Sequence, residues 1–204
     1  MRSLDALLRR GFPQRLVTVA WPQGMCLESD VFSACFMLKE MVADRMYENR
    51  PGFAPKPGQT VVDVGGHHGF FTLRAAARVG PGGRVLAVEA FPANLRLLKK
   101  NIDANELGWA SAVGIAASDS AGEAVFHVFK LVTGGSLVFK PEGTEAITVA
   151  KDTLDHILAQ ERVAHVDLIK IDVEGACLSV LAGAKKTLEQ RPLLAQKVAK
   201  VGVK

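Results

Sequence analysis

Apolar residues along the chain follow two patterns in turn. Residues 61–64 and 84–90 are short, nearly continuous apolar runs, whereas residues 70–77 and 92–102 carry apolar side chains at helical spacing. Short buried runs that alternate with helices are typical of parallel strands joined by helical crossovers. The sequence therefore predicts an α/β fold with a doubly wound, mostly parallel sheet, in which the first two strands lie side by side.

The same alternation continues through the second half of the chain. We expect a third strand over 110–117, a hairpin formed by 123–130 and 137–140, a strand over 147–150, a helix over 153–158, a strand over 166–172, and a helix that carries Leu178, Leu181 and Leu188. After Pro192 at most one more strand fits. We expect this edge of the sheet to be open, so that it is covered by a second copy of the chain, covered by a helix, or left exposed.

Residues 1–58 predict an N-terminal extension that packs on this core. The extension begins with a short helix after Ser3, followed by a hairpin over 16–27. Ser29 or Asp30 then caps a longer helix. Its apolar positions recur at helical spacing, and we expect them to face the core rather than a cofactor: Val31, Cys35, Leu38, Val42 and Met46.

A glycine-rich corner follows the first strand of the predicted sheet. A dinucleotide site needs G-x-G-x-x-G, whereas this corner offers only Gly65 and Gly69 in register, after Asp63, which is a poor fit to NAD. Asp63 would repel a pyrophosphate but suits a cationic ligand, and the loop amides can hold a carboxylate. S-adenosylmethionine combines a sulfonium, an ammonium and a carboxylate without any phosphate. The corner therefore favours this cofactor, and a glycine turn without a ligand is the alternative.

Acidic side chains follow two further strands. Glu89 ends the second strand, where a carboxylate can accept two hydrogen bonds from a ribose diol, with a helix-capping or solvated glutamate as the alternative. Lys170, Asp172 and Glu174 form a second acidic corner. Strand alternation puts Lys170 and Asp172 on one face, so either the lysine neutralises Asp172 or the cluster faces a methyl acceptor. In the second case Asp172 or Glu174 would take the proton that a hydroxyl acceptor must lose.

Composition limits the classes of protein to which the chain can belong. Its 204 residues suffice for one full domain, and no uncharged apolar run approaches the length of a membrane span. The three cysteines lack metal-site spacing, so we expect a reduced, cytoplasmic location. The net charge of +4 comes from scattered basic residues, so a nucleic-acid partner is not expected.

Five motifs occur in a fixed order: Val61 to Leu73, Val88 to Pro92, Thr153 to Asp155, Leu168 to Ala176, and Val180 to Ala184. The step Tyr47-Glu48 precedes them. In order and spacing these motifs resemble the FkbM-type S-adenosylmethionine-dependent methyltransferases. The resemblance runs from about Tyr47 to about Pro192 and implies a class I methyltransferase, Rossmann-like fold over residues 59–204.

The resemblance also implies a cofactor, a reaction and a set of site residues. The cofactor would be S-adenosylmethionine, and the reaction would be O-methylation of a hydroxyl on a small molecule or a glycan. The cofactor-binding residues would be Asp63, Gly65, Gly66, His67, Gly69, Glu89, Ala90, Phe91, Ser118 and Asp119, the last two at the adenine edge. Lys170, Asp172 and Glu174 would form the catalytic corner that faces the acceptor. Acceptor choice would lie in the N-terminal helices and the inserted hairpin.

The sequence departs from that family at three places. His67-His68 replaces the usual loop residues, Cys177 stands where a glutamate is usual, and the family continues into further strands after Pro192. Adjacent histidines could bind a metal or act as a base, but neighbouring side chains diverge, so we expect no metal and interpret both as solvated or cofactor-lining. Two alternative functions are a catalytically impaired cofactor-binding or interaction module truncated at its C-terminus, and a nucleic-acid methyltransferase, suggested only by the basic balance.

Overall fold

The structure is a computed structural model, and it describes residues 15–48, 51–129, 134–140, 142 and 144–196. The helix expected after Ser3 lies outside the described residues. No helix in the described part of the chain is long and apolar enough to cross a membrane.

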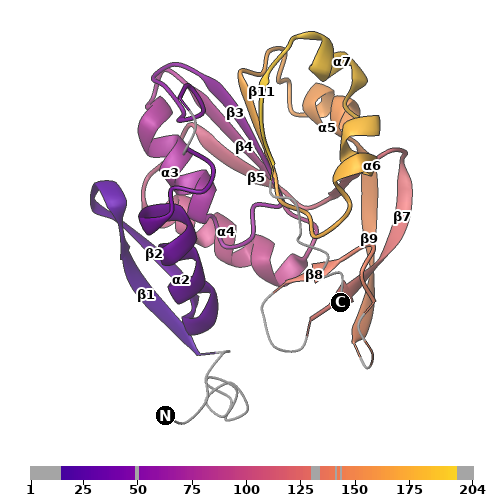
Figure 1. Ribbon diagram of the computed structural model, residues 1–204, viewed down its shortest axis with the longest axis horizontal. Coiled ribbons are helices and arrows are strands. Elements are labelled where there is room, and N and C mark those ends of the chain that lie inside the picture. Colours follow the sequence, from indigo (N-terminus) through magenta and orange to yellow (C-terminus); the bar gives the residue numbers. More distant parts are fainter. Residues whose placement is uncertain (1–14, 49–50, 130–133, 141, 143, 197–204) are drawn as a thin grey trace.

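A five-stranded parallel sheet forms the centre of the molecule (Figure 1). Its strands are β3 (Thr60–Val64), β4 (Arg84–Val88), β5 (Ala110–Val113), β10 (Leu168–Ile171) and β11 (Leu193–Gln196). They lie in the order β11-β10-β3-β4-β5, and every neighbouring pair is parallel. The predicted doubly wound α/β sheet is confirmed, including the adjacency of its first two strands. One strand, β11, follows Pro192 and forms an edge of this sheet among the described residues.

Helices cover both faces of this sheet, as the alternating side chains of its buried strands require. On one face Val61, Val85 and Leu168 pack in a core with α3 (Phe70–Val79) and α4 (Pro92–Ala104). On the other face Val62, Leu86 and Ile169 share a core with α5 (Leu154–Gln160), α6 (Cys177–Ala182) and α7 (Lys185–Glu189). Pro92 starts α4 because its fixed φ suits the first helical position, as the sequence indicates.

The N-terminal segment packs on the α3 side of the sheet. It contains the antiparallel hairpin of β1 (Leu16–Trp21) and β2 (Met25–Asp30), which the sequence predicts, with a short turn η2 (Pro22–Gly24) between the strands. Trp21 and Leu27 lie in the same core cluster as the side chains of α3. The helix α2 (Val31–Met37) follows, capped by Asp30, whose Oδ1 accepts a hydrogen bond from the Ser33 amide at 2.8 Å.

The face that we expected this helix to bury is correct only in part, because Leu38 and Met46 pack against the core. A π-helical turn, η3 (Leu38–Ala43), continues α2, and its wider turn rotates the later side chains away from the 3.6-residue pattern. The buried positions are Ser33, Ala34, Glu40 and Met41, whereas Cys35 and Val42 are exposed. An apolar spacing that assumes an uninterrupted α-helix therefore fails at Val42, which lies within the π-helical turn.

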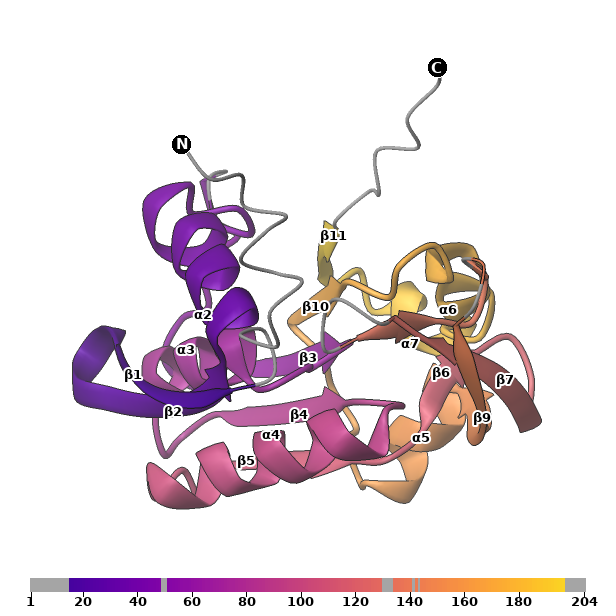
Figure 2. The ribbon, with the colours of Figure 1, turned by 90° about the horizontal axis from the view of Figure 1, so that it is seen from below.

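A second, four-stranded sheet stands beside the first, at the end of the molecule away from the β1–β2 hairpin (Figure 2). It consists of β6 (Ala116–Ser118), β7 (Gly122–Val128), β8 (Gly135–Ser136) and β9 (Glu145–Thr153), in the order β6-β9-β7-β8. The antiparallel pair β7–β8 confirms the inserted hairpin, but its second strand is Gly135–Ser136 and not the predicted 137–140. The single strand expected over 110–117 is wrong, because the chain leaves the first sheet at Gly114 and enters the second as β6.

The long helix expected near the C-terminal end also divides in two. Gly183 separates α6 from α7, and a Cβ atom there would lie 1.9 Å from the Ser118 carbonyl oxygen. The close approach of this turn to β6 therefore requires glycine. Leu178, one of the three leucines of the expected helix, has 80% of its surface exposed.

Candidate functional site

A cavity of about 440 Å³ lies beyond the carboxyl ends of β3, β4 and β10. This volume is within the range of small-molecule sites, and the position is where open α/β sheets bind ligands. The structure brings eight of the site residues that we inferred from the sequence to its wall: Gly65, Gly66, His67, Glu89, Ala90, Lys170, Asp172 and Glu174. Three corners that are far apart in the sequence thus meet around one space.

Five other expected site residues do not line this cavity: Asp63, Gly69, Phe91, Ser118 and Asp119. On the strand that leads to Ser118, the small side chains of Ala116 and Ala117 line it instead. Asp119 is exposed and lies 3.5 Å from Lys151 Nζ. In this structure these five residues are therefore not placed to contact a ligand in the cavity directly.

The glycine corner owes its shape to the contact between two loops. Gly65 has a φ of +83°, and a Cβ atom on it would lie 2.0 Å from the carbonyl oxygen of Asp172. A residue without a side chain therefore allows the first and second acidic corners to touch.

The backbone amides of this corner are already hydrogen-bonded. Those of Gly65 and Gly66 donate to the Val88 carbonyl at 2.9 and 3.2 Å, and that of Gly69 donates to the Gly66 carbonyl at 2.9 Å. The His67 amide donates to Glu89 Oε2 at 2.7 Å. Our expectation that the loop amides bind a ligand carboxylate is thus wrong for these four groups.

Glu89 joins the glycine corner to the start of α4. Besides the His67 amide, its carboxylate accepts the Phe91 amide at 2.8 Å, through Oε1. Burial raises the pKa of Glu89, and the two backbone hydrogen bonds oppose that rise. Since each carboxylate oxygen has two acceptor sites, both oxygens can still accept a hydroxyl donor.

Lys170 neutralises Asp63 rather than Asp172, so the ion pair that we expected from strand alternation is wrong. Lys170 and Asp63 are register partners on neighbouring strands, and Lys170 Nζ lies 2.8 Å from Asp63 Oδ1. The ammonium also donates to the Gly65 carbonyl at 2.7 Å, and Thr72 Oγ1 donates to Asp63 Oδ2 at 2.6 Å. Burial alone would lower the pKa of Lys170, but the charges of Asp63 and Asp172 outweigh it and raise this pKa.

Asp172 is held by a tyrosine that our sequence reasoning did not place in the site. Tyr47 donates its hydroxyl hydrogen to Asp172 Oδ2 at 2.6 Å, across 125 positions of sequence. The tyrosine is buried, and its ring packs edge to face on Phe71 with the centroids 5.6 Å apart. Burial, followed by the charge of Asp172, raises the pKa of Tyr47, which therefore remains a neutral donor.

The next residue, Glu48, fixes the segment that carries Tyr47. Its carboxylate accepts two hydrogen bonds from Arg74, at 2.6 and 2.7 Å, and lies 2.9 Å from Arg78 Nη2. Both arginines belong to α3, so this bidentate contact anchors the chain before β3 to the helix after it. We noted Tyr47-Glu48 in the sequence only through the family resemblance. In the structure the two residues make separate contacts, Tyr47 with Asp172 and Glu48 with the arginines of α3.

His67 and His68 lie against each other rather than diverging, so that part of our expectation is wrong. Their ring centroids are 4.0 Å apart, because His67 adopts a left-handed backbone conformation with a φ of +52°. His67 lines the cavity, whereas His68 is completely buried behind it. Within the described residues, no three His, Cys, Asp or Glu side chains come together as metal ligands.

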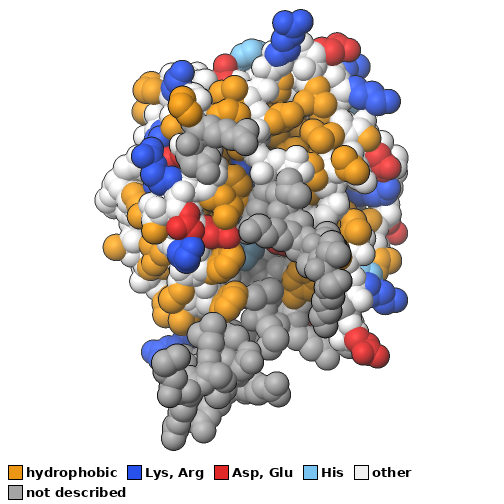
Figure 3. Space-filling model, viewed as in Figure 1, with side chains coloured by type: hydrophobic (Ala, Val, Ile, Leu, Met, Phe, Trp, Pro, Cys, Tyr) orange, Lys and Arg blue, Asp and Glu red, His pale blue; other side chains and the backbone are white. Residues whose placement is uncertain are grey.

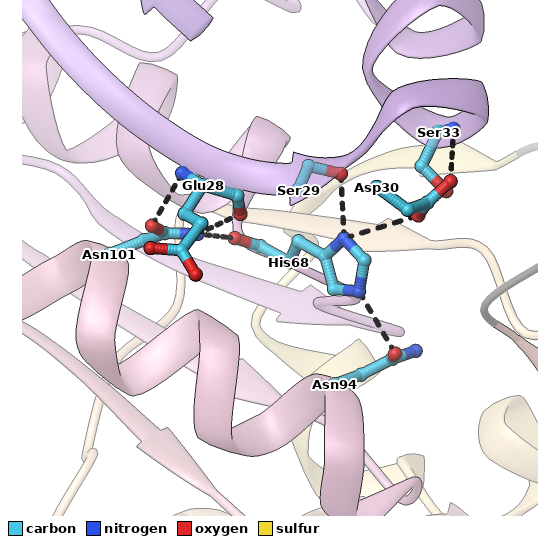
Figure 4. A network of polar contacts seen from close by, with 7 residues as sticks. All are labelled: Glu28, Ser29, Asp30, Ser33, His68, Asn94 and Asn101. Carbon is cyan, nitrogen blue, oxygen red and sulfur yellow. Dashed lines mark hydrogen bonds and ion pairs between the residues drawn. The ribbon is translucent and has the colours of Figure 1, made fainter. Parts of the chain in front are cut away.

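His68 connects the N-terminal segment to the start of α4 (Figure 4). Its Nε2 donates to Asn94 Oδ1 at 3.1 Å, so the neutral ring accepts the Ser29 hydroxyl at Nδ1, at 2.8 Å. Asp30 Oδ2 lies 3.8 Å from Nδ1. Burial, and then the proximity of His67, lowers the pKa of His68 to about 3.

Asn101 of α4 completes this network. Its Nδ2 donates to the carbonyls of His68 and Glu28, at 2.8 and 2.9 Å, and its Oδ1 accepts the Glu28 amide at 2.8 Å (Figure 4). The amide side chain therefore ties β2 to the glycine corner. No pattern in the sequence singles out Asn101, because its partners are set by packing.

Two segments that carry no sequence motif supply much of the remaining cavity wall. Phe32, Phe36 and Met37 line it from α2, and Phe126 and Leu137 line it from the β7–β8 hairpin and its flank. These are the segments in which we placed acceptor choice.

Comparison with known proteins is consistent with this geometry. Residues 63–198 match the model of the family described as "Methyltransferase FkbM domain". The chain is 28% identical over 198 residues to 31-O-demethyl-FK506 methyltransferase FkbM of Streptomyces tacrolimicus, covering 82% of this chain and 74% of that protein. It is 26% identical over 171 residues to Methyltransferase 1 of Beauveria bassiana, covering 72% of this chain and 66% of that protein.

A solved structure has a similar fold. It is the crystal structure of methyltransferase FkbM from Methylobacillus flagellatus, which is 22% identical with a TM-score of 0.52. The similarity covers 74% of this chain but 36% of that one, so the chain spans about a third of its length.

Proposed function

Because the chain belongs to the FkbM methyltransferase domain family, we propose that it transfers a methyl group from S-adenosylmethionine to a hydroxyl oxygen of a small molecule or a glycan. The observation that carries the proposal is the single cavity shared by Glu89, the glycine corner and Asp172. A cofactor and an acceptor would both have to lie against these three corners, and the corners surround one space.

The cavity fits this cofactor in its chemistry. Its polar wall includes Glu89, Asp172 and Glu174, which suit a ligand with a sulfonium and an ammonium. Glu89 is buried and held by two backbone amides, so its carboxylate is fixed where it can accept the two hydroxyls of a ribose. Gly66 lines the same wall, and its lack of a side chain lets the corner pack closely on Leu98 of α4, from which a Cβ atom would lie 2.9 Å.

When bound, S-adenosylmethionine supplies a methyl group whose carbon–sulfur bond breaks, with the electron pair kept by sulfur, as the acceptor oxygen forms the new carbon–oxygen bond. The chain's own residues then have to align the acceptor and remove its proton. Asp172 faces the cavity, and its carboxylate is oriented by Tyr47. Asp172 is the group that accepts the hydroxyl proton. Lys170 is paired with Asp63 and neutralises the charge of that neighbouring carboxylate.

Calorimetric titration with S-adenosylhomocysteine tests this proposal. We expect saturable binding to the intact protein and a weakening of about tenfold or more for Glu89→Gln, because an amide cannot accept at both of its ends. The matched control is Glu123→Gln, which alters an exposed carboxylate on β7 and should bind like the wild type. A folded wild-type protein that does not bind S-adenosylhomocysteine would contradict the proposal.

A further inference from the structure

The cavity wall is unusually rich in phenylalanine. Six of the ten phenylalanines in the sequence line it: Phe32 and Phe36 from α2, Phe70 and Phe71 from α3, Phe126 from β7, and Phe129 just after β7. The rings come from elements on both sides of the glycine corner, so they do not belong to one core layer. On the face seen in Figure 3, hydrophobic side chains gather on both halves of the molecule.

Two of these rings lie where water reaches them. Phe36 has 44% of its surface exposed and is stacked on Phe32, with the ring centroids 6.2 Å apart and the planes 6° apart. Both line the cavity. Apolar surface left in contact with water is a typical mark of a binding site, because a ligand that covers it gains the free energy of its burial.

Three polar side chains of the wall, by contrast, form their hydrogen bonds within the protein: Ser136, Asn94 and Lys170. Ser136 Oγ donates to the Glu174 carbonyl at 2.7 Å and accepts the amides of Val138 and Phe139, both at 2.9 Å. Asn94 Oδ1 accepts from His68, and Lys170 bonds Asp63 and the Gly65 carbonyl.

A glycan in this cavity would need many donors and acceptors for its hydroxyls. Each hydroxyl that is buried without a partner costs about 1–3 kcal/mol, so side chains that are already bonded to the protein disfavour such a ligand. An apolar body makes no such demand and gains from every ring that it covers. A single hydroxyl needs only one acceptor, and Asp172 is at the wall.

We propose that the acceptor is a hydroxyl carried on an apolar or aromatic body rather than a glycan. The rings of α2 and of the β7 side hold that body, and Asp172 receives the hydroxyl. This inference rests on the proposed function, since it names the acceptor class of the same site. Phe36 is the residue whose contribution can be tested most directly, because its exposure lets it change without disturbing the core.

The test uses the full chain saturated with S-adenosylhomocysteine, so that the cofactor part of the cavity is filled. Calorimetry then compares two probes, 2-naphthol and methyl β-D-glucopyranoside. We expect saturable binding of 2-naphthol and none of the glucoside over the same concentration range. Phe36→Ser should weaken 2-naphthol binding about tenfold, while S-adenosylhomocysteine affinity stays within about twofold.

The matched control is Val125→Ser, which removes an exposed apolar side chain from β7 that does not line the cavity and should bind 2-naphthol like the wild type. Binding of the glucoside but not of 2-naphthol, binding of neither probe, or equal 2-naphthol affinities of Phe36→Ser and the wild type would each overturn the acceptor class while leaving cofactor binding intact. Failure of the wild type to bind S-adenosylhomocysteine would instead overturn the proposed function, and the acceptor class with it.

Discussion

Lys170 and Asp63 form an ion pair between two neighbouring inner strands of the central sheet, with Nζ 2.8 Å from Oδ1 and both side chains almost entirely buried. Their Cα atoms are register partners on the parallel strands β10 and β3. Two charges can remain in this interior because each is also hydrogen-bonded, the lysine to the Gly65 carbonyl and the aspartate to Thr72.

Removing one partner of this pair should therefore be costly. We expect Lys170→Met to lower the free energy of unfolding by about 3–5 kcal/mol, because Asp63 is left charged and buried. Urea unfolding measures the change, and Lys39→Met, which breaks an exposed pair with Asp44, is the matched control with no expected loss. A Lys170→Met protein as stable as the wild type would show that the pair does not compensate the buried charge.

The contact between the two corners predicts a strict requirement for glycine at position 65. A methyl group on Gly65 would lie 2.0 Å from the Asp172 carbonyl oxygen, on a backbone with a φ of +83°. We expect Gly65→Ala to cost about 2–4 kcal/mol of stability and to weaken binding of S-adenosylhomocysteine. The control is Gly82→Ala, since a Cβ atom on Gly82 meets nothing within 4 Å. Equal unfolding midpoints for the two variants would contradict this prediction.

Tyr47→Phe separates the hydrogen bond to Asp172 from the packing of the ring. The variant keeps the edge-to-face contact with Phe71 but loses the donor that lies 2.6 Å from Asp172 Oδ2. We expect a loss of about 1.5–3 kcal/mol in the free energy of unfolding, the range for a hydrogen bond to a charged group. A double-mutant cycle with Asp172→Ala isolates the coupling. Additive losses around that cycle would mean that the two side chains do not stabilise each other.

The buried His68 predicts a pH dependence of stability. Its pKa is about 3 in the folded protein against an ordinary value of 6.5, so between these values the unfolded chain holds more protons than the folded one. Stability should therefore be unaffected by this group above about pH 6.5, and should fall by about 1.4 kcal/mol per pH unit between about pH 6 and pH 4.

His68→Gln removes this titration while leaving the other groups in place. Urea unfolding at several pH values should give the variant a shallower decline than the wild type below pH 6, and parallel curves between pH 7 and pH 8, where the histidine is neutral in both states. Parallel curves over the whole range would show that His68 does not enter the folded state as the neutral ring.

The difference between prediction and structure follows from the range of the interactions involved. The glycine corner, the proline at the start of α4 and the Asp30 cap are signals within a few residues, and each of these elements is found where the sequence predicts it. The buried face of the helix after Asp30 is found only in part, because a π-helical turn over residues 38–43 changes which of the later side chains are buried, and no local pattern in the sequence predicts that turn. Site residues on the three corners reached the cavity, whereas Ser118 and Asp119 did not, because the chain changes sheets after β5.

The sequence alone determined the alternation of parallel strands and helices, the two acidic corners and the family, since these depend on burial periodicity, glycine positions and motif spacing along the chain. The tertiary structure decided which charges pair and which rings line the cavity. Lys170 faces Asp63 because of the register of two strands, and Tyr47 reaches Asp172 across 125 positions because α3 and the segment before β3 pack together. Such contacts depend on the folded arrangement of distant segments, so they cannot be read from neighbouring residues.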